Sequence, residues 1–525
     1  MRPTPFRSGI FDRAYSVPIF GGGCKRATHI RGVERVKFLH SRSLSLRTHA
    51  IATPLGTGYN GIVTIIITPS LSMPKSTDIC ILETESSTQF FPYRSPAKFG
   101  GRVVNDVTLL NVSVRVRTRD GKEAVGRGSM SMGNIWAWPS QTLSTDQTLQ
   151  AMIAFGHNVA AGGKNPGEFG HPLELVYDYS KEYQRLADET TQTQNVDAMG
   201  KLAQLVAVSP FESAVFDAYG RVLGANSYNL LSAEYCNRDL AYYLNSEFAG
   251  EYLDQYVLAQ PKARMPLYHL VGALDPLDAS DVEKPLRDGL PEDLAEWIPY
   301  NGLTHMKIKL NGDDLDWDVN RVLRIDQIAE EVQAKRGVLQ WFYSADFNEK
   351  CGNVEYVLDF LKRIGETRPQ AIDRLQYIEQ PTHRNLRAYP ENKMHKAAAI
   401  KPVVIDEALV DFDSLLYSRE MGYSGVALKA CKGHAEALLM GAAAQKYKMF
   451  LCVQDLTCPG ASFLHSATLS ARLPGVQAIE GNGRQYCPAA NKGWEDLYPS
   501  MFKISNGMLG TDVFDEPGLG FRWAN

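Results

Sequence analysis

The stretch Leu375-Gln-Tyr-Ile-Glu-Gln-Pro381 joins a short apolar run to a carboxylate, Glu379, at the end of that run. Two other apolar runs end in the same way, one at Asp346, 33 residues earlier, and one at Asp406, 27 residues later. Each interval is long enough for one helix and one strand. A polar residue at the end of each successive strand is the layout of a (β/α)8 barrel, which builds its site at the C-terminal ends of its strands.

Eight short apolar runs in the second half of the chain agree with this interpretation. They lie at residues 265–272, 304–310, 339–345, 375–378, 403–405, 425–428, 449–453 and 476–479. Amphipathic segments of helix length separate most of them, for example at 317–334 and 354–364. Eight strands that alternate with helices predict a closed parallel barrel of the α/β class.

The first half of the chain has a different pattern. Residues 106–118 form a β-branched run in near alternation, a turn signal follows at Arg119-Asp-Gly121, and a second strand-like run covers 123–128. Helical patterns then appear at 143–162 and 211–223. A hairpin followed by helices predicts an α+β domain ahead of the barrel.

The composition argues against several classes of protein. A net charge of −4 over 525 residues favours neither nucleic acids nor membranes as partners. The longest aliphatic stretch, at 61–68, is too short to span a bilayer. The eight cysteines contain no CxxC pair, which is typical of reduced thiols. We therefore expect a globular protein of the cytoplasm.

Two lysines end the apolar run that precedes Asp346. Lys307 and Lys309 point to the same side of a strand, because residues i and i+2 share a face, while Ile308 points to the other side. Their mutual repulsion is expected to lower the pKa of at least one of them, and a lysine poised near neutrality can remove a proton. On this motif alone, a solvated strand end with basic residues is the simpler interpretation.

The three carboxylates change that balance. Brought together in a barrel mouth, Asp346, Glu379 and Asp406 cannot all stay ionised without a cation, and oxygen ligands of this kind suit Mg²⁺ or Mn²⁺. Each acid taken alone is also compatible with a helix N-cap just after a strand. Asn348 and Glu407 are candidate partners of these ligands, or ordinary polar residues of loops.

A further lysine, Lys429, ends the sixth apolar run. Strands two and six of an eight-stranded barrel lie opposite each other, so we expect Lys429 to lie across the barrel from Lys309. A lysine on each side of a bound substrate would provide one base for each face.

In this order and at these spacings, the motifs KIK, D-x-N, IEQP, IDE and LKACKG resemble those of the enolase superfamily. Within it they resemble the Lys-x-Lys type of the mandelate racemase/muconate lactonizing enzyme family, in its muconate-lactonizing branch. The resemblance covers residues 90–490, approximately, and implies an α+β capping domain before the barrel. It also implies that Asp346, Glu379 and Asp406 bind the metal.

The resemblance assigns roles to the lysines as well. Lys309 matches the base, Lys307 matches the neighbour that tunes it and contacts the substrate, and Lys429 matches the opposing lysine. Members of the family remove the proton α to a carboxylate, and the metal stabilises the resulting enediolate. The implied protein is a Mg²⁺-dependent isomerase or lyase, a cycloisomerase or a racemase/epimerase, that acts on a small carboxylic acid and forms homo-oligomers.

Three alternatives stay open. A dehydratase of acid sugars or hydroxy acids would use the same residues, whereas a metal-free Schiff-base aldolase that uses Lys429 would keep its activity in chelator. A barrel that only binds a ligand or partner is the third. Two residues are candidate substrate contacts: Asp455, after the seventh run, and Trp136, in a segment (129–139) that resembles the mobile loop of the family.

These patterns divide the chain into four parts. We expect a basic N-terminal extension at 1–85, the α+β capping domain at 86–262, the barrel at 263–483, and a C-terminal segment at 484–525 that packs on the cap. The first 50 residues hold ten Lys and Arg against two acids. A disordered tail, a targeting peptide and a start codon assigned too early are all compatible with that bias.

Overall fold

The computed structural model describes residues 75–99 and 102–524. Most of the extension expected at 1–85 therefore lies outside the described residues. The expected start of the folded part at residue 86 falls inside a strand, because β1 (Ile79–Phe99) already begins at Ile79. In the described part of the chain, no helix is long and apolar enough to cross a membrane.

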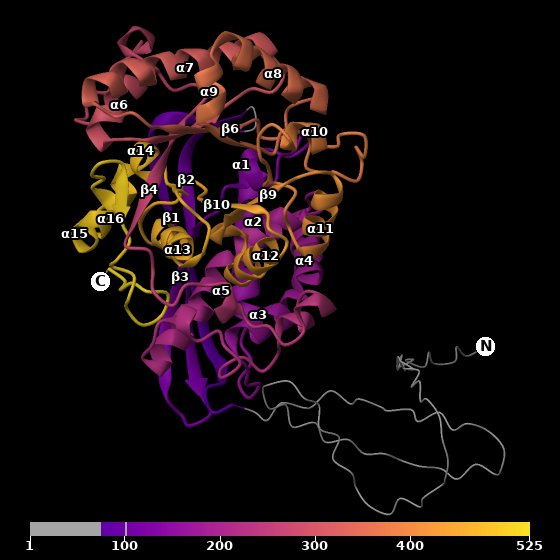
Figure 1. The fold of residues 1–525 in the computed structure, drawn as a ribbon. Coiled ribbons are helices and arrows are strands. Elements are labelled where there is room, and N and C mark those ends of the chain that lie inside the picture. The colour runs from indigo at the N-terminus through magenta and orange to yellow at the C-terminus, as the bar shows by residue number, and fades with distance from the viewer. Residues whose placement is uncertain (1–74, 100–101, 525) are drawn as a thin grey trace, which may run out of the picture. The chain divides into compact units, whose positions relative to one another are not determined.

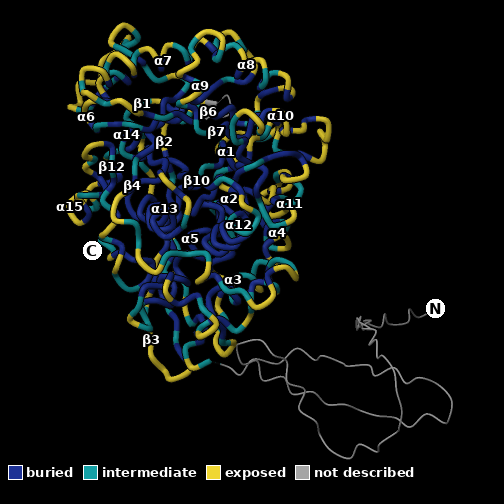
Figure 2. The backbone as a smooth tube through the Cα atoms, viewed as in Figure 1, coloured by how far each residue is buried: buried dark blue, intermediate teal, exposed yellow. Residues whose placement is uncertain are grey.

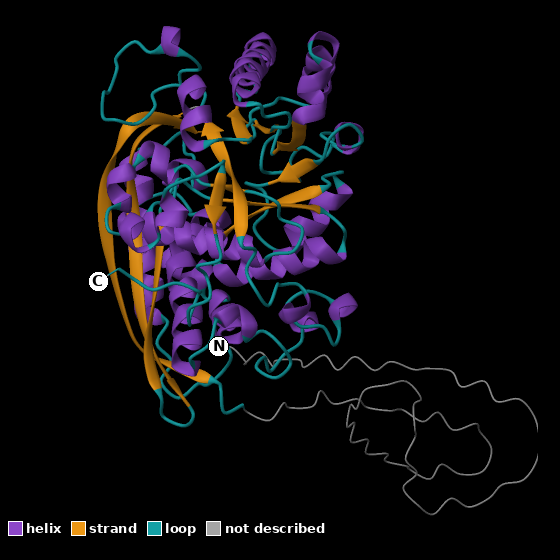
Figure 3. Cartoon of the chain, turned by 60° about the vertical axis from the view of Figure 1, so that its left-hand side comes forward, coloured by secondary structure: helices purple, strands orange, loops and turns teal. Residues whose placement is uncertain are grey.

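The capping domain begins with an antiparallel sheet in the order β1-β2-β3, where β2 spans Arg102–Thr118 and β3 spans Glu123–Ser131. The predicted hairpin is present, and its turn contains Gly121 in the left-handed region at φ 88°. Figure 3 shows these long strands side by side, with helices packed against one face of the sheet. The alternation in β2 buries Val112, Val114 and Val116 on that face.

Four helices build most of the rest of the cap. They are α2 (Thr145–Gly162), α3 (Pro172–Ser180), α4 (Tyr183–Gln194) and α5 (Lys201–Leu223), and the short helix α1 (Asn134–Ala137) precedes them. Helix α5 lies directly on β3 (Figure 1). A Cβ atom at Gly128 would lie 1.9 Å from the carbonyl oxygen of Pro210, so this close packing requires glycine. The α+β character of the domain follows.

Eight parallel strands of the described chain form the barrel, each paired with the next, and the last pairs with the first through Ile479 and Leu267. They are β4 (Arg264–Val271), β5 (His305–Lys309), β6 (Phe342–Asp346), β7 (Leu375–Glu379), β8 (Val403–Ile405), β9 (Gly425–Lys429), β10 (Phe450–Gln454) and β11 (Ile479–Glu480). The (β/α)8 barrel with an N-terminal α+β capping domain, predicted from the sequence, is confirmed.

The helices between these strands surround the barrel (Figure 1). They are α6 (Leu294–Asn301), α7 (Leu315–Arg336), α8 (Val354–Thr367), α9 (Pro369–Arg374), α10 (His395–Ala398), α11 (Phe412–Glu420), α12 (His434–Lys446) and α13 (Gly460–Arg472). Figure 2 shows α5, α12 and α13 as mostly buried helices, in contrast with the outer surface of α7 and α8. The buried helices lie where the cap meets the barrel, since α5 contacts α12 and β3 contacts α13.

The C-terminal segment contains α14 (Gly483–Tyr486), α15 (Trp494–Leu497), α16 (Pro499–Phe502) and β12 (Met508–Gly510). It contacts the cap, because the backbone N–H of Leu519 donates to Asp217 of α5 at 3.0 Å. It also contacts the barrel, since β12 pairs with β4 in antiparallel register. The segment therefore joins the two domains.

Candidate active site

The three predicted metal ligands lie at the ends of adjacent strands. Asp346 ends β6, Glu379 ends β7, and Asp406 follows β8, and all three side chains are fully buried. Asp346 and Glu379 are direct neighbours in the parallel register. The strand ends therefore bring the three carboxylates to one edge of the barrel, as the sequence predicted.

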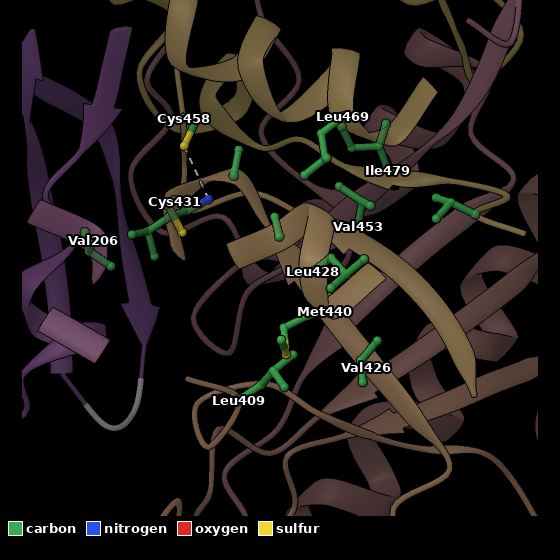
Figure 4. Close-up of a cluster of buried hydrophobic side chains, with 14 of the residues drawn as sticks. Val206, Leu409, Val426, Leu428, Cys431, Met440, Val453, Cys458, Leu469 and Ile479 are labelled. Carbon is green, nitrogen blue, oxygen red and sulfur yellow. Dashed lines mark hydrogen bonds between the residues drawn. The ribbon is translucent and has the colours of Figure 1, made fainter. Parts of the chain in front are cut away.

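Strand alternation aims the lysines at the same place. Val426 and Leu428 of β9 pack in the apolar layer that also holds Met440 of α12 and Leu469 of α13 (Figure 4). Ala427 of the same strand belongs to a separate cluster inside the barrel. Lys429 follows the parity of Ala427 and so points to the interior.

Lys307 is the centre of an ion-pair network. Its Nζ lies 2.9 Å from Glu379, 2.7 Å from Glu480 and 3.1 Å from Asp346. Burial alone would lower the pKa of Lys307, but these three carboxylates outweigh burial and raise that pKa well above its ordinary value. The expectation that repulsion within the Lys-x-Lys motif lowers a pKa is wrong for Lys307, because the carboxylates lie closer.

Glu480 was not selected from the sequence as a site residue. It ends β11 and is 4% exposed. The signal that could have found it is the one that found Asp346, namely a carboxylate at the end of an apolar run.

Lys309 and Lys429 lie on opposite sides of the barrel. Lys309 donates to Asp346 and, at 3.0 Å, to Asn348. Lys429 lies 2.8 Å from Asp406. Their strands, β5 and β9, are separated by β6, β7 and β8 on one side of the closed barrel and by β4, β11 and β10 on the other. The predicted opposition of the two lysines is therefore present in the structure.

Asp406 lies between two ammonium groups. Besides Lys429, the buried Lys432 approaches it to 2.9 Å, and this residue of the LKACKG motif was missed. Burial alone would raise the pKa of Asp406, but the two lysines hold it well below its ordinary range. The pKa of Lys429 is raised in turn, because the attraction of Asp406 exceeds the effect of burial.

The cap reaches the site through Trp136. Its indole N–H donates to Glu407 at 2.9 Å, and Asn348 donates to the same carboxylate oxygen at 3.1 Å. The ring of Trp136 also lies under the Lys429 ammonium, 4.5 Å from its centroid. Burial, together with the charges of the nearby aspartates, raises the pKa of Glu407 to about 7. These three predicted residues therefore form one hydrogen-bonded group beside the carboxylates.

Asp455 is buried behind this group, at the end of β10. It accepts a hydrogen bond from the backbone N–H of Cys458 at 3.0 Å and so caps the loop that follows β10. Burial and the negative charge of Glu480 raise the pKa of Asp455 to about 8. The neighbouring Gln454 donates to Glu379 and holds its second oxygen.

The donor set fits a hard divalent cation. Neither oxygen of Asp406 accepts a hydrogen bond of good geometry from the described residues. Among the described residues, buried carboxyls also outnumber buried ammoniums here by six to four, an excess of acidic groups that a divalent cation would offset. The carboxyls are Asp346, Glu379, Asp406, Glu407, Asp455 and Glu480, and the ammoniums are Lys307, Lys309, Lys429 and Lys432.

The residues fit a divalent cation in their ligand chemistry and their charge, but they are not arranged as a closed coordination shell. Among the residues that the structure describes, no three His, Cys, Asp or Glu side chains already surround one point as a metal cage. The Lys307 ammonium lies between Asp346 and Glu379 and supplies the positive charge there. Burial and the other two carboxylates raise the pKa of Glu379 well above its ordinary value.

The fold and these strand-end residues define a two-domain barrel protein with a buried lysine–carboxylate site. Residues 290–525 match the family model described as enolase C-terminal domain-like. The resemblance to the enolase superfamily, in its mandelate racemase/muconate lactonizing enzyme family, is thereby confirmed. A search of curated protein sequences gave no match.

Solved structures share the fold over most of the chain. A mandelate racemase/muconate lactonizing protein from Herpetosiphon aurantiacus is 18% identical with a TM-score of 0.55, over 84% of this chain and 98% of that one. A dipeptide epimerase from Enterococcus faecalis, complexed with Mg and L-Leu-L-Tyr, is 13% identical with a TM-score of 0.56, over 84% and 99%. Muconate lactonizing enzyme from Pseudomonas fluorescens, complexed with muconolactone, is 19% identical with a TM-score of 0.54, over 84% and 96%.

Proposed function

We propose that this protein removes the proton α to the carboxylate of a small organic acid and so isomerises it, as a cycloisomerase or as a racemase/epimerase. The observation that carries the proposal is the pair of buried lysines, Lys309 and Lys429, on opposite sides of the barrel mouth. Each is ion-paired with a different carboxylate of the strand-end set. Similarity in fold to a dipeptide epimerase and to a muconate lactonizing enzyme supports isomerisation.

Mg²⁺ held by Asp346, Glu379 and Asp406 would supply the positive charge that stabilises negative charge on the substrate carboxylate. The Mg in the structure of the dipeptide epimerase supports this choice of ion. Lys307, which contacts two of these carboxylates, is suited to bind the substrate carboxylate as well.

The two lysines then divide the work at the α-carbon. Nζ of Lys309 takes the proton from one face. Nζ of Lys429 lies on the opposite face, where it donates a proton in an epimerisation or stays a cation in a cycloisomerisation. Trp136 covers Lys429 from the cap side and excludes water from it, because both side chains are almost fully buried.

Proton exchange at the α-carbon tests this mechanism directly. The protein with Mg²⁺ in D₂O is incubated with a library of small carboxylic acids, and exchange is followed by NMR. Lys309→Met and Lys429→Met should each slow exchange at one face by at least about 100-fold, the size of a general-base contribution. Lys362→Met is the control, because Lys362 is 67% exposed on α8 and far along the chain from either motif.

The same experiment separates the alternatives. If both lysine variants exchange as fast as the Lys362 control, the mechanism is wrong. Exchange that survives a chelator, together with a borohydride-trapped adduct on Lys429, would instead establish the Schiff-base aldolase. Loss of water from the substrate would identify a dehydratase that uses the same residues.

A further inference from the structure

A cavity of about 380 Å³ lies between helix α6 and the C-terminal segment. Helix α6 contributes Trp297 and Tyr300 to its lining, while α14 contributes Arg484 and α16 contributes Phe502. These helices lie on one side of the molecule (Figure 1). None of the described lining residues belongs to the lysine–carboxylate site. The volume falls in the range of roughly 300–1,000 Å³ that is typical of sites for small molecules.

The guanidinium group of Arg484 lacks a partner for its charge in this cavity. Its Nε donates to the carbonyl oxygen of Phe502, and no described residue forms an ion pair with it. Burial lowers the pKa of Arg484 to about 10 and outweighs the opposing effects of Tyr300 and Glu495. Because the carbonyl group occupies Nε, the two Nη nitrogens are left for a ligand. Such a planar pair of donors matches two oxygens of a carboxylate or phosphate.

Asn491 supplies a second donor to the same cavity. Its side chain is 2% exposed, and its Oδ1 accepts a hydrogen bond from the backbone N–H of Gly460 at 2.8 Å. That bond identifies the acceptor end of the amide, so Nδ2 is the donor end. Asn491 lines the cavity, and no described residue accepts a hydrogen bond from its Nδ2. An acceptor atom in the cavity would complete this hydrogen bond.

The rest of the lining suits an apolar group. Trp297 and Tyr300 form an edge-to-face pair with their ring centroids 5.7 Å apart. Further apolar contacts are available from Leu290, Pro488, Phe502 and Ile504. Burial of a ring or an alkyl chain against such a surface is favourable. The cavity therefore offers donors to an anionic group and apolar contacts to the body that carries it.

We propose that this cavity binds a small organic anion, whose carboxylate or phosphate accepts hydrogen bonds from Arg484 and Asn491 while its apolar body packs on Trp297 and Tyr300. The inference is independent of the proposed function, because it uses no residue of the barrel mouth. It gives the protein a second ligand site besides the one for its substrate. The exposed Glu495 also lines the cavity, so its negative charge opposes binding of an anion there.

Calorimetric titration of the full chain tests this site with two anions and one neutral analogue: phenyl phosphate, benzoate and benzamide. At least one of the anions should bind at least about tenfold more tightly than benzamide, because charge-assisted hydrogen bonds are stronger than neutral ones. The anion that binds more tightly shows whether the site prefers a phosphate or a carboxylate.

Three substitutions should change the affinity for that anion in different directions. Arg484→Gln should weaken binding at least about tenfold. Asn491→Asp should do the same, because it keeps the acceptor for Gly460 and replaces the donor by a charged oxygen. Glu495→Gln should strengthen binding about threefold, since it removes an exposed like charge. Arg185→Gln is the charge-matched control and should change nothing, because Arg185 is 56% exposed on α4 of the cap.

Benzamide that binds as tightly as both anions, or no binding of any of the three probes, would overturn the inference. Anion binding that is unchanged by all three substitutions would place the anion elsewhere, for example at the barrel mouth, and would overturn it as well. If the variants of Arg484 and Asn491 fail to fold, Glu495→Gln decides alone, because Glu495 is exposed. A rise in affinity then supports the site, and no rise rejects it.

Discussion

Replacing Trp136 by Phe should remove one hydrogen bond between the cap and the barrel mouth. The substitution keeps an aromatic ring beneath the Lys429 ammonium, which lies 4.5 Å from the centroid of the present indole. It removes the indole N–H, which donates to Glu407 at 2.9 Å. Both side chains are buried, at 6% and 2% exposure, so water cannot easily replace the lost donor.

The loss of stability in Trp136→Phe depends on the hydrogen bonds that Glu407 keeps. The Glu407 oxygen that accepts from Trp136 also accepts from Asn348 at 3.1 Å, so it is not left without a donor. Loss of this hydrogen bond should therefore lower the free energy of unfolding by about 1.5 kcal/mol. This value is the lower end of the range of about 1.5–3 kcal/mol for hydrogen bonds to charged groups. The weaker cation–π contact of Phe adds about 0.5 kcal/mol, which brings the total to about 2 kcal/mol.

A double-mutant cycle isolates the hydrogen bond. Urea unfolding of Trp136→Phe, Glu407→Met and the double variant should give a coupling energy of about 1.5 kcal/mol. Trp138→Phe is the matched control, because Trp138 lies in the same cap segment and makes no described hydrogen bond to Glu407. A coupling for Trp136 within about 0.5 kcal/mol of zero, or no larger than that of Trp138, would refute the link between cap and barrel.

Three further outcomes test other parts of the molecule. Gly128→Ala should lower the free energy of unfolding by about 3 kcal/mol in urea, since its Cβ atom would meet the backbone of α5, whereas Gly352→Ala, where no atom lies within 4 Å, should be nearly neutral. Burial lowers the pKa of His171 to about 3, so this histidine stays neutral in the folded protein at pH values where the unfolded chain binds a proton. Neutral His171 therefore costs no stability above about pH 6.5, but the free energy of unfolding falls by about 1.4 kcal/mol for each pH unit below that value. His171→Asn should remove this part of the pH dependence of stability. Mg²⁺ at 100 times its dissociation constant should add about 2.7 kcal/mol to the stability, seen as a rise in Tm. Asp406→Asn should abolish that rise, and a rise that persists in this variant would contradict the ligand set.

The barrel and its acidic residues were predictable because buried parallel strands are apolar on both faces. Every position of β5, β7 except one, and β9 is buried, so each strand reads as a short apolar run that a polar residue ends. The order of these polar residues along the sequence then matches the order of their strands around the barrel. Asp346, Glu379 and Lys429 were identified by this rule alone.

The start of the cap was not predictable in the same way. Strand β1 contains Pro92 and Pro96, which normally argue against a strand. The sheet tolerates both because β1 is an edge strand, and its register with β2 shifts between Pro92 and Ala97. Lys98, whose ammonium donates to Asn311 of the barrel at 2.9 Å, lies just beyond that irregularity, so this contact had no local signal in the sequence.

Pairings between distant segments account for what else was missed. Lys307 contacts Glu379 and Glu480, the second of them 173 residues away, and these contacts, with that of Asp346, raise its pKa, against the expectation from the motif. The repulsion between Lys307 and Lys309 is a local property that a sequence contains. The three carboxylates that outweigh it come together only when β6, β7 and β11 meet in the closed barrel.

The cap contributes a side chain beside each of the two opposed lysines, and the two contributions differ in kind. Lys98 lines a cavity beside Lys309, while the indole of Trp136 lies against Lys429. The surroundings of the two lysines are therefore not equivalent, because one carries a further positive charge and the other an aromatic ring. Under the proposed function, the two faces of the α-carbon would meet these different surroundings, so we expect changes in the cap to affect proton exchange at the two faces unequally.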